Sequence, residues 1–124
     1  MGLTLITGAA SGIGAATARR LAGTGRHLIL HTGSNRAALE REAAACQALG
    51  AQTTLVVGDL ALSGTVAELL AAAGAVGRPL QAVVANAGYA VDQPLMALDP
   101  DRLSEVLQFM VVGLTRLMQA TLPM

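Results

Sequence analysis

The 124-residue chain contains no lysine, since all eight of its basic residues are arginine. Mechanisms that depend on a lysine side chain are therefore excluded, among them a Walker-type phosphate loop and a Schiff base. The single cysteine, Cys46, allows neither an internal disulfide nor an all-cysteine metal site, and it fits a reducing compartment. Aromatic residues are also scarce, and Tyr89 is the one tyrosine.

An excess of positive charge is missing as well. Eight acidic residues balance the eight basic ones, which argues against a nucleic-acid-binding protein, because such proteins need basic side chains that displace counterions from phosphates. No uncharged apolar run approaches the roughly 20 residues that span a membrane, and the first residues lack the basic segment of a signal peptide. We therefore expect a cytoplasmic protein that binds neither nucleic acid nor membrane.

The apolar content and the length of the chain are typical of one globular domain. Apolar residues make up 53% of the chain and charged residues 13%, which is typical of a globular protein with a core to bury. A chain of this length leaves little room for a second core. Residues 1–124 are therefore expected to form a single domain.

Strand and helix patterns alternate four times. Short apolar runs that are typical of buried strands lie at residues 3–7, 28–31, 53–57 and 80–85. Helical patterns follow them at about residues 12–22, 35–49, 65–76 and 100–122. Nearly continuous apolar strands that alternate with helices form parallel sheets covered on both faces. The sequence therefore predicts an α/β fold with a Rossmann-type doubly wound parallel sheet of about four strands.

Short polar residues predict where three of the helices begin. Ser34 or Asn35 can cap the second helix, because their side chains accept hydrogen bonds from amides that have no partner within a helix. Thr65, with Glu68 three residues later, has the pattern of a capping box for the third helix. Asp99 stands directly before a proline and is expected to cap the fourth helix.

The junction between the first strand and the first helix is rich in glycine. It reads Thr7-Gly8-Ala9-Ala10-Ser11-Gly12-Ile13-Gly14. Gly8 allows a sharp turn out of the strand, Gly12 leaves room where a pyrophosphate would sit, and Gly14 lets the helix approach the sheet. Ser11 and Ile13 complete the start of the helix, whose free amides and dipole favour an anion. A glycine turn without a ligand is the alternative, but the strand before it and the helix after it favour a cofactor loop.

This turn resembles the TGxxxGxG cofactor loop of the short-chain dehydrogenase/reductase family. Two further motifs match the family in order, Asp59-Leu60 after the third strand and Asn86-Ala87-Gly88 after the fourth. The resemblance covers essentially the whole chain. It implies that Asp59 contacts the adenine of a dinucleotide cofactor and that the Asn-Ala-Gly turn lies beside the cofactor. Simpler roles stay open for both motifs, an Asx turn at Asp59 and a link between loops at Asn86.

The choice of cofactor depends on the end of the second strand. An acidic residue there would accept a hydrogen bond from the ribose of NAD and repel the 2′-phosphate of NADP. Thr32 falls at this position, and Ser34, Asn35 and Arg36 follow it without an acid and could bind a phosphate. Arg36 could equally be a solvated residue of the helix, and Ser11 stands where many NADP-preferring relatives have a basic residue. We predict NADP(H) in preference to NAD(H).

The resemblance implies hydride transfer between a nicotinamide and a carbonyl or alcohol, carried out by a serine, a tyrosine and a lysine four residues after the tyrosine. The chain has no lysine, and the residue four beyond Tyr89 is Gln93, so no catalytic residue is assigned. Met110 stands where many relatives have an asparagine linked to proton relay, and it is expected only to pack.

Family members are considerably longer, and their catalytic residues lie beyond the fourth helix. We therefore expect the cofactor-binding half of an oxidoreductase, truncated relative to the family, that meets a small carbonyl or alcohol substrate only when completed. A non-catalytic NAD(P)-binding or regulatory module and an inactive remnant are the alternatives.

A truncated sheet has consequences for association. Val83 and Val84 would lie on an exposed edge strand, which can pair with another chain. The last helix has an apolar stripe over residues 103–122 that is wider than one face needs, and relatives use this helix at a subunit interface. We therefore expect self-association through this strand or this helix. His27 and His31 are expected to be structural, because no ligand set for a metal accompanies them.

Overall fold

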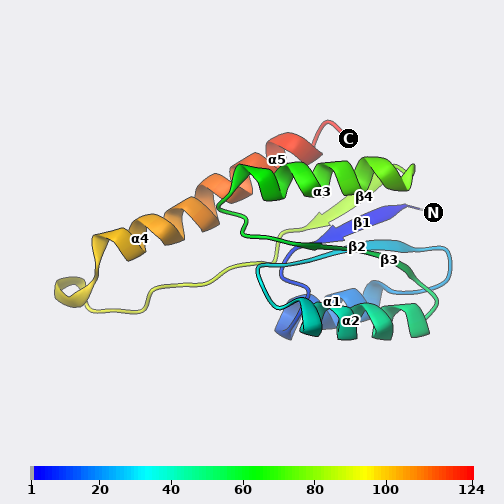
Figure 1. The fold of residues 1–124 in the computed structure, drawn as a ribbon, viewed down its shortest axis with the longest axis horizontal. Helices are drawn as coiled ribbons and strands as arrows, with labels where there is room; N and C mark the ends of the chain where they lie inside the picture. Colours follow the sequence, from blue (N-terminus) through cyan, green and yellow to red (C-terminus); the bar gives the residue numbers. More distant parts are fainter. Residues whose placement is uncertain (1) are drawn as a thin grey trace.

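The chain forms one parallel sheet with helices on both faces, as a computed structural model describes it for residues 2–124 (Figure 1). The strands are β1 (Leu3–Ile6), β2 (His27–Thr32), β3 (Gln52–Val57) and β4 (Leu80–Val84). The helices are α1 (Gly12–Leu21), α2 (Arg36–Ala48), α3 (Ser63–Val76), α4 (Pro100–Leu107) and α5 (Leu114–Thr121). The strand order is β3-β2-β1-β4, with every neighbouring pair parallel. The predicted Rossmann-type, doubly wound sheet is confirmed.

Two apolar layers hold the helices on the sheet. Helices α1 and α2 cover one face, where Ile6 of β1 packs in a cluster with Leu39 of α2 (Figure 1). Helices α3 and α5 cover the opposite face, where Leu5 of β1 packs in a cluster with Leu69 and Leu117. Because neighbouring residues of β1 are buried on opposite faces, the strand is apolar almost throughout.

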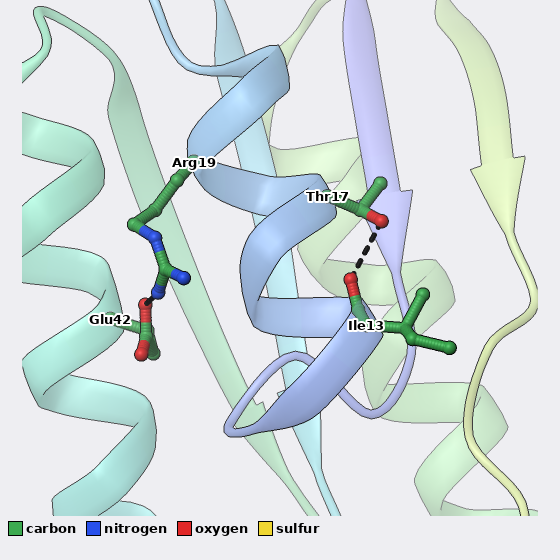
Figure 2. Close-up of polar contacts among 4 residues, drawn as sticks. All are labelled: Ile13, Thr17, Arg19 and Glu42. Carbon is green, nitrogen blue, oxygen red and sulfur yellow. Dashed lines mark hydrogen bonds and ion pairs between the residues drawn. The ribbon is translucent and has the colours of Figure 1, made fainter.

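An ion pair joins α1 to α2. The guanidinium of Arg19 donates to the carboxylate of Glu42, as Figure 2 shows. Both side chains are partly exposed, so the pair contributes little to stability, about 1 kcal/mol at most. Arg19 belongs to the last turn of α1, which places it at the opposite end of the helix from the glycine turn.

Two of the three predicted helix caps are confirmed. The side chain of Asn35 accepts a hydrogen bond from the Ala38 amide at 3.1 Å, so Asn35, and not Ser34, caps α2. The side chain of Asp99 accepts one from the Asp101 amide at 2.9 Å at the start of α4.

The predicted capping box at Thr65 is wrong. Helix α3 begins two residues earlier, at Ser63, with Leu62 in the cap position. The Thr65 side chain is buried instead against the loop after β3, where a Cβ atom at Gly58 would lie 2.6 Å from its hydroxyl oxygen. Tertiary packing thus uses the side chain that the local pattern assigned to a cap.

The predicted last helix is interrupted. A π-helical segment, Gln108–Gly113, separates α4 from α5, and the helical part ends at Thr121. Gly113 lets this segment approach the loop after β3, since a Cβ atom there would lie 2.4 Å from the Leu60 carbonyl oxygen. No helix within residues 2–124 is both long and apolar enough to cross a membrane.

Strand β4 lies at an edge of the sheet, as predicted. It pairs with β1 on one side, and no strand of the described chain lies on its other side. A groove of about 260 Å³ runs beside it, lined by Val83 of β4 and by Met118 and Leu122 at the end of the chain's last helix.

Candidate functional site

The three loops that carry the sequence motifs meet at one edge of the sheet. They follow β1, β3 and β4, and the carboxyl ends of parallel strands lie together. Asn86 connects two of these loops, because its side-chain amide donates to the carbonyl of Thr7 at 3.3 Å and to that of Gly8 at 3.1 Å. The linking role left open for Asn86 is therefore present in the structure.

Thr7 organises the turn after β4. Its hydroxyl oxygen accepts hydrogen bonds from the amides of Asn86 and Ala87, both at 3.1 Å, and donates to the Val84 carbonyl at 3.4 Å. Nothing in the sequence pattern beyond the motif's own threonine indicates this role. Gly88, which ends the turn, packs on Met110, since a Cβ atom at Gly88 would lie 3.0 Å from the methionine's terminal atoms.

The three motif glycines are required for different structural reasons. Gly8 and Gly12 have φ angles of +68° and +56°, a region that other residues rarely adopt. A Cβ atom at Gly14 would lie 2.1 Å from the Gly8 carbonyl oxygen and 2.6 Å from the Asn86 side-chain nitrogen. Gly14 thus permits the close approach that was predicted, whereas Gly12 faces open space, because no described residue beyond its own stretch of α1 comes within 4 Å of such a Cβ.

Among the described residues, no group accepts a hydrogen bond from the first amides of α1. Ser11 occupies the cap position but its side chain makes no capping hydrogen bond, and the first turn contains no acidic residue. Free amides at the positive end of a helix dipole form an anion site. Ile13 is 78% exposed, and its side chain projects away from α2 (Figure 2).

A cavity of about 590 Å³ lies at the same edge of the sheet, between the loops after β2 and β3 and the helix α4. Ser34 and Asp59 line it from the loops, and Glu105 and Phe109 line it from the other side. The ring of Tyr89 closes one part of the wall by packing edge-on against Phe109, with ring centroids 5.1 Å apart. A cavity of this size accommodates a small organic ligand.

Asp59 has the local role that the sequence left open. One of its carboxylate oxygens accepts a hydrogen bond from the Ala61 amide at 2.8 Å, which forms an Asx turn. The second oxygen has no hydrogen bond within the described residues and remains able to accept one from a ligand. The side chain of Leu60 is buried in the core and anchors the loop after β3 there.

The residues predicted around the ribose are only partly brought together. Thr32 is buried, and its carbonyl accepts from the Gly58 amide at 3.0 Å. Asn35 is occupied as a helix cap. Arg36 is the first residue of α2, exposed, outside the lining of the cavity and in no ion pair with another described residue.

His31 contributes to this site in a way that was not predicted. Its Nδ1 accepts from the Gly8 amide at 3.2 Å, and its Nε2 lies 2.8 Å from the Gly58 carbonyl oxygen. Burial lowers the pKa of His31 from the ordinary value of 6.5. In the part of the chain that the structure describes, no three His, Cys, Asp or Glu side chains gather to hold a metal ion.

Comparison with known proteins identifies the family. The sequence model of the short chain dehydrogenases matches residues 3–124. The chain belongs to this family. A short chain dehydrogenase is an oxidoreductase, and the Rossmann-type sheet described above is the part of the family fold that the chain contains.

The individual proteins that the chain resembles include reductases and a polyketide synthase. It is 38% identical over 119 residues to the polyketide synthase GfsA of Streptomyces halstedii, a match that covers 95% of this chain and 2% of that protein. It is 33% identical to a 3-oxoacyl (acyl-carrier-protein) reductase of Agrobacterium tumefaciens C58, solved with NADP bound, with a TM-score of 0.86 over 98% of this chain and 46% of the other.

The L-sorbose reductase of Gluconobacter frateurii, solved with NADPH and L-sorbose, shares the fold. Its TM-score is 0.90 and its identity 24%, again over 98% of this chain and 46% of the other. The chain therefore spans less than half the length of the solved relatives that it matches.

Proposed function

We propose that residues 1–124 form a single NADP(H)-binding unit of a short chain reductase. One observation carries the proposal: the uncapped first turn of α1 and the open space at Gly12 lie at the same strand edge as a nucleoside-sized cavity lined by Ser34 and Asp59. Together they match the two parts of a dinucleotide, an anionic pyrophosphate and an adenosine.

Each motif has a place in this proposal. The amides beside Gly12 and Ile13 hold the pyrophosphate, and Ser11 and Gly14 set the start of the helix. Asp59 contacts the adenine in the cavity, and the turn Asn86-Ala87-Gly88, with Gly8 beneath it, supports the nicotinamide half. A bound nicotinamide would supply or accept the hydride in the family's reaction.

We propose a preference for NADP(H) because of the residues after β2. Position 32, where an acidic residue would repel a 2′-phosphate, is a threonine. Ser34 lines the cavity, and the guanidinium of Arg36 is available to bind a 2′-phosphate. The 3-oxoacyl reductase at 33% identity was solved with NADP bound, which supports the same choice.

Calorimetric titration of two arginine variants of α2 with NADPH and NADH tests this preference. Arg36→Ala is expected to weaken NADPH binding about tenfold, since a charge-assisted hydrogen bond is lost, and to leave NADH binding unchanged. Arg41→Ala, an exposed arginine farther along the same helix, is the control and is expected to bind both cofactors like the wild type. Equal losses for NADPH and NADH, or no loss at Arg36→Ala, would contradict a 2′-phosphate contact.

For the substrate we propose a 3-oxoacyl group carried as a thioester, on the strength of the 3-oxoacyl (acyl-carrier-protein) reductase relative. Turnover is expected when this chain is part of a longer protein or is joined by a partner chain, because the chain contains no lysine for the family's tyrosine and lysine pair. A non-catalytic NAD(P)-binding module is the second candidate, favoured by the same observation. NADPH oxidation by the isolated chain with a 3-oxoacyl thioester is expected to stay at background; clear turnover would overturn this assignment.

We also propose that the chain self-associates through β4 and its neighbouring groove. The outer side of β4 offers backbone groups that no strand within residues 2–124 pairs with, and Val83, Met118 and Leu122 line the adjacent apolar surface. Sedimentation is expected to show dimers or larger species at roughly tens of micromolar, a range typical of weak association. A clean monomer at that concentration would refute this association.

A further inference from the structure

The imidazole of His31 connects two loops of the proposed cofactor site. His31 is the fifth residue of the six-residue strand β2 and is 1% exposed. The Gly58 carbonyl can only accept a hydrogen bond and the Gly8 amide can only donate one, so Nε2 carries the proton and Nδ1 accepts. Both contacts are satisfied only when the ring is neutral and in this one tautomer.

The backbone around His31 reinforces the same connection. The His31 carbonyl accepts from the Ala9 amide at 2.7 Å, so this one residue holds two consecutive amides of the glycine turn. On the other side, the carbonyl of the next residue, Thr32, accepts from the Gly58 amide at 3.0 Å. The side chain therefore completes a bridge from the turn after β1 to the residue that precedes Asp59.

We propose that His31 is a positioning residue for the dinucleotide: its neutral imidazole holds the glycine turn and the Asp59 loop at a fixed separation. The inference rests on the proposed function, since these two loops are the ones that receive the pyrophosphate and the adenine. His31 itself is buried beneath the turn and acts through Gly8 and Gly58.

Protonation would break this bridge. A proton on Nδ1 would face the Gly8 amide, and two donors cannot form a hydrogen bond. Burial lowers the pKa of His31, while the Gly58 carbonyl and the negative charge of Asp59 act in the opposite direction. Because burial lowers the pKa of His31 from its ordinary value of 6.5, the bridge is intact at neutral pH and is lost only as the pH falls through this lowered pKa.

Two substitutions of His31 distinguish the effect of its two hydrogen bonds from the effect of protonating its ring. His31→Gln supplies a carboxamide that can accept from Gly8 and donate to Gly58 but does not titrate, whereas His31→Leu removes both contacts. The matched control is His27→Gln at the other end of β2, where Nε2 of His27 lies 2.8 Å from the Thr54 hydroxyl, away from the loops of the site. These are the chain's two histidines, so no other imidazole titrates in this range.

The first measurement uses the cofactor-free protein. In an amide-resolved NMR titration, the signals of Gly8 and Gly58 are expected to change with the midpoint of the His31 ring in the wild type and in His27→Gln. They are expected to stay constant over that range in His31→Gln. If the amide signals of Gly8 and Gly58 do not change as His31 titrates, the proposal is overturned.

The second measurement is the affinity for NADP⁺ at about pH 7.5 and at a pH below the His31 midpoint that the amide titration gives, since burial lowers that midpoint from the ordinary histidine value. At the higher pH, the affinity of His31→Leu for NADP⁺ is expected to be about tenfold lower than that of the wild type, because the Gly8 amide is left without an acceptor. His31→Gln is expected to keep the wild-type affinity there and to show a smaller loss at the lower pH than the wild type or His27→Gln. The titration of the cofactor's own phosphate is common to all variants and cancels in this comparison.

The outcomes are distinguishable. Equal pH dependence in the wild type and His31→Gln would overturn the positioning role while the proposed function stands. Absence of wild-type NADP⁺ binding at the higher pH would refute the proposed function, and the amide titration would still decide whether His31 holds the two loops. If His31→Leu does not fold, the comparison of wild type, His31→Gln and His27→Gln is sufficient.

Discussion

Gly14 is the position where the structure makes the sharpest prediction about stability. In Gly14→Ala the added methyl carbon would lie 2.1 Å from the Gly8 carbonyl oxygen and 2.6 Å from the Asn86 side-chain nitrogen. Overpacking of this kind costs about 1–3 kcal/mol, and loss of the hydrogen bond from Asn86 to Gly8 costs about 1 kcal/mol more. Alanine regains about 1 kcal/mol of helix propensity, so the free energy of unfolding is expected to fall by about 2 kcal/mol.

A second helical glycine provides the matched control. Gly74 in α3 has open space where a Cβ atom would be, so Gly74→Ala is expected to raise the free energy of unfolding by about 0.5–1 kcal/mol. Urea unfolding followed by circular dichroism measures both changes. The midpoint is expected to fall by about 1 M for Gly14→Ala and to rise for Gly74→Ala, with slopes unchanged. A Gly14→Ala variant as stable as the wild type would refute the close approach.

Three further predictions test the fold and its surface. Asn35→Ala is expected to lower the free energy of unfolding by about 1 kcal/mol in the same assay, because the Ala38 amide loses its cap; an unchanged midpoint would contradict that role. Burial and the neighbouring Glu42 carboxylate raise the pKa of the Cys46 thiol, so a thiol reagent is expected to label it slowly in the folded chain and fast in urea; equal rates would show that it is accessible. Leu122→Lys is expected to reduce self-association in sedimentation without changing the urea midpoint, since the side chain lines the groove beside β4; unchanged association would exclude this surface.

The fold was predictable because its strands are apolar, and the two central ones, β1 and β2, are buried on both faces. Nearly continuous apolar runs bounded by turns predicted all four strands, and the structure extends or shortens them by one or two residues. Local patterns failed where tertiary contacts decide. Thr65 packs on Gly58 instead of capping α3, and the approach of Gly113 to Leu60 accompanies a π-helical segment that periodicity does not reveal.

The candidate site was predictable to the extent that backbone conformation fixes residue type. Gly8 and Gly12 have positive φ angles, which is why glycine marks the turn in the sequence. The polar contacts were not predictable in the same way. His31 meets Gly8 across 23 residues of sequence, and Thr7 meets Asn86 across 79, so no local pattern shows which side chain faces which loop.

Titration of the ¹⁵N-labelled chain with NADPH decides whether the loops after β1, β2, β3 and β4 form one dinucleotide site. Saturable shifts are expected at the amides of Gly12, Ser34, Asp59 and Asn86, and Gly12→Ala is expected to fold but to abolish them. At a φ of +56° that substitution costs about 1–2 kcal/mol of strain and places a methyl group where the pyrophosphate would lie. Circular dichroism of the variant confirms folding. A folded wild-type chain whose amides do not respond to NADPH, or respond only at residues away from these loops, would refute a dinucleotide site at this edge of the sheet.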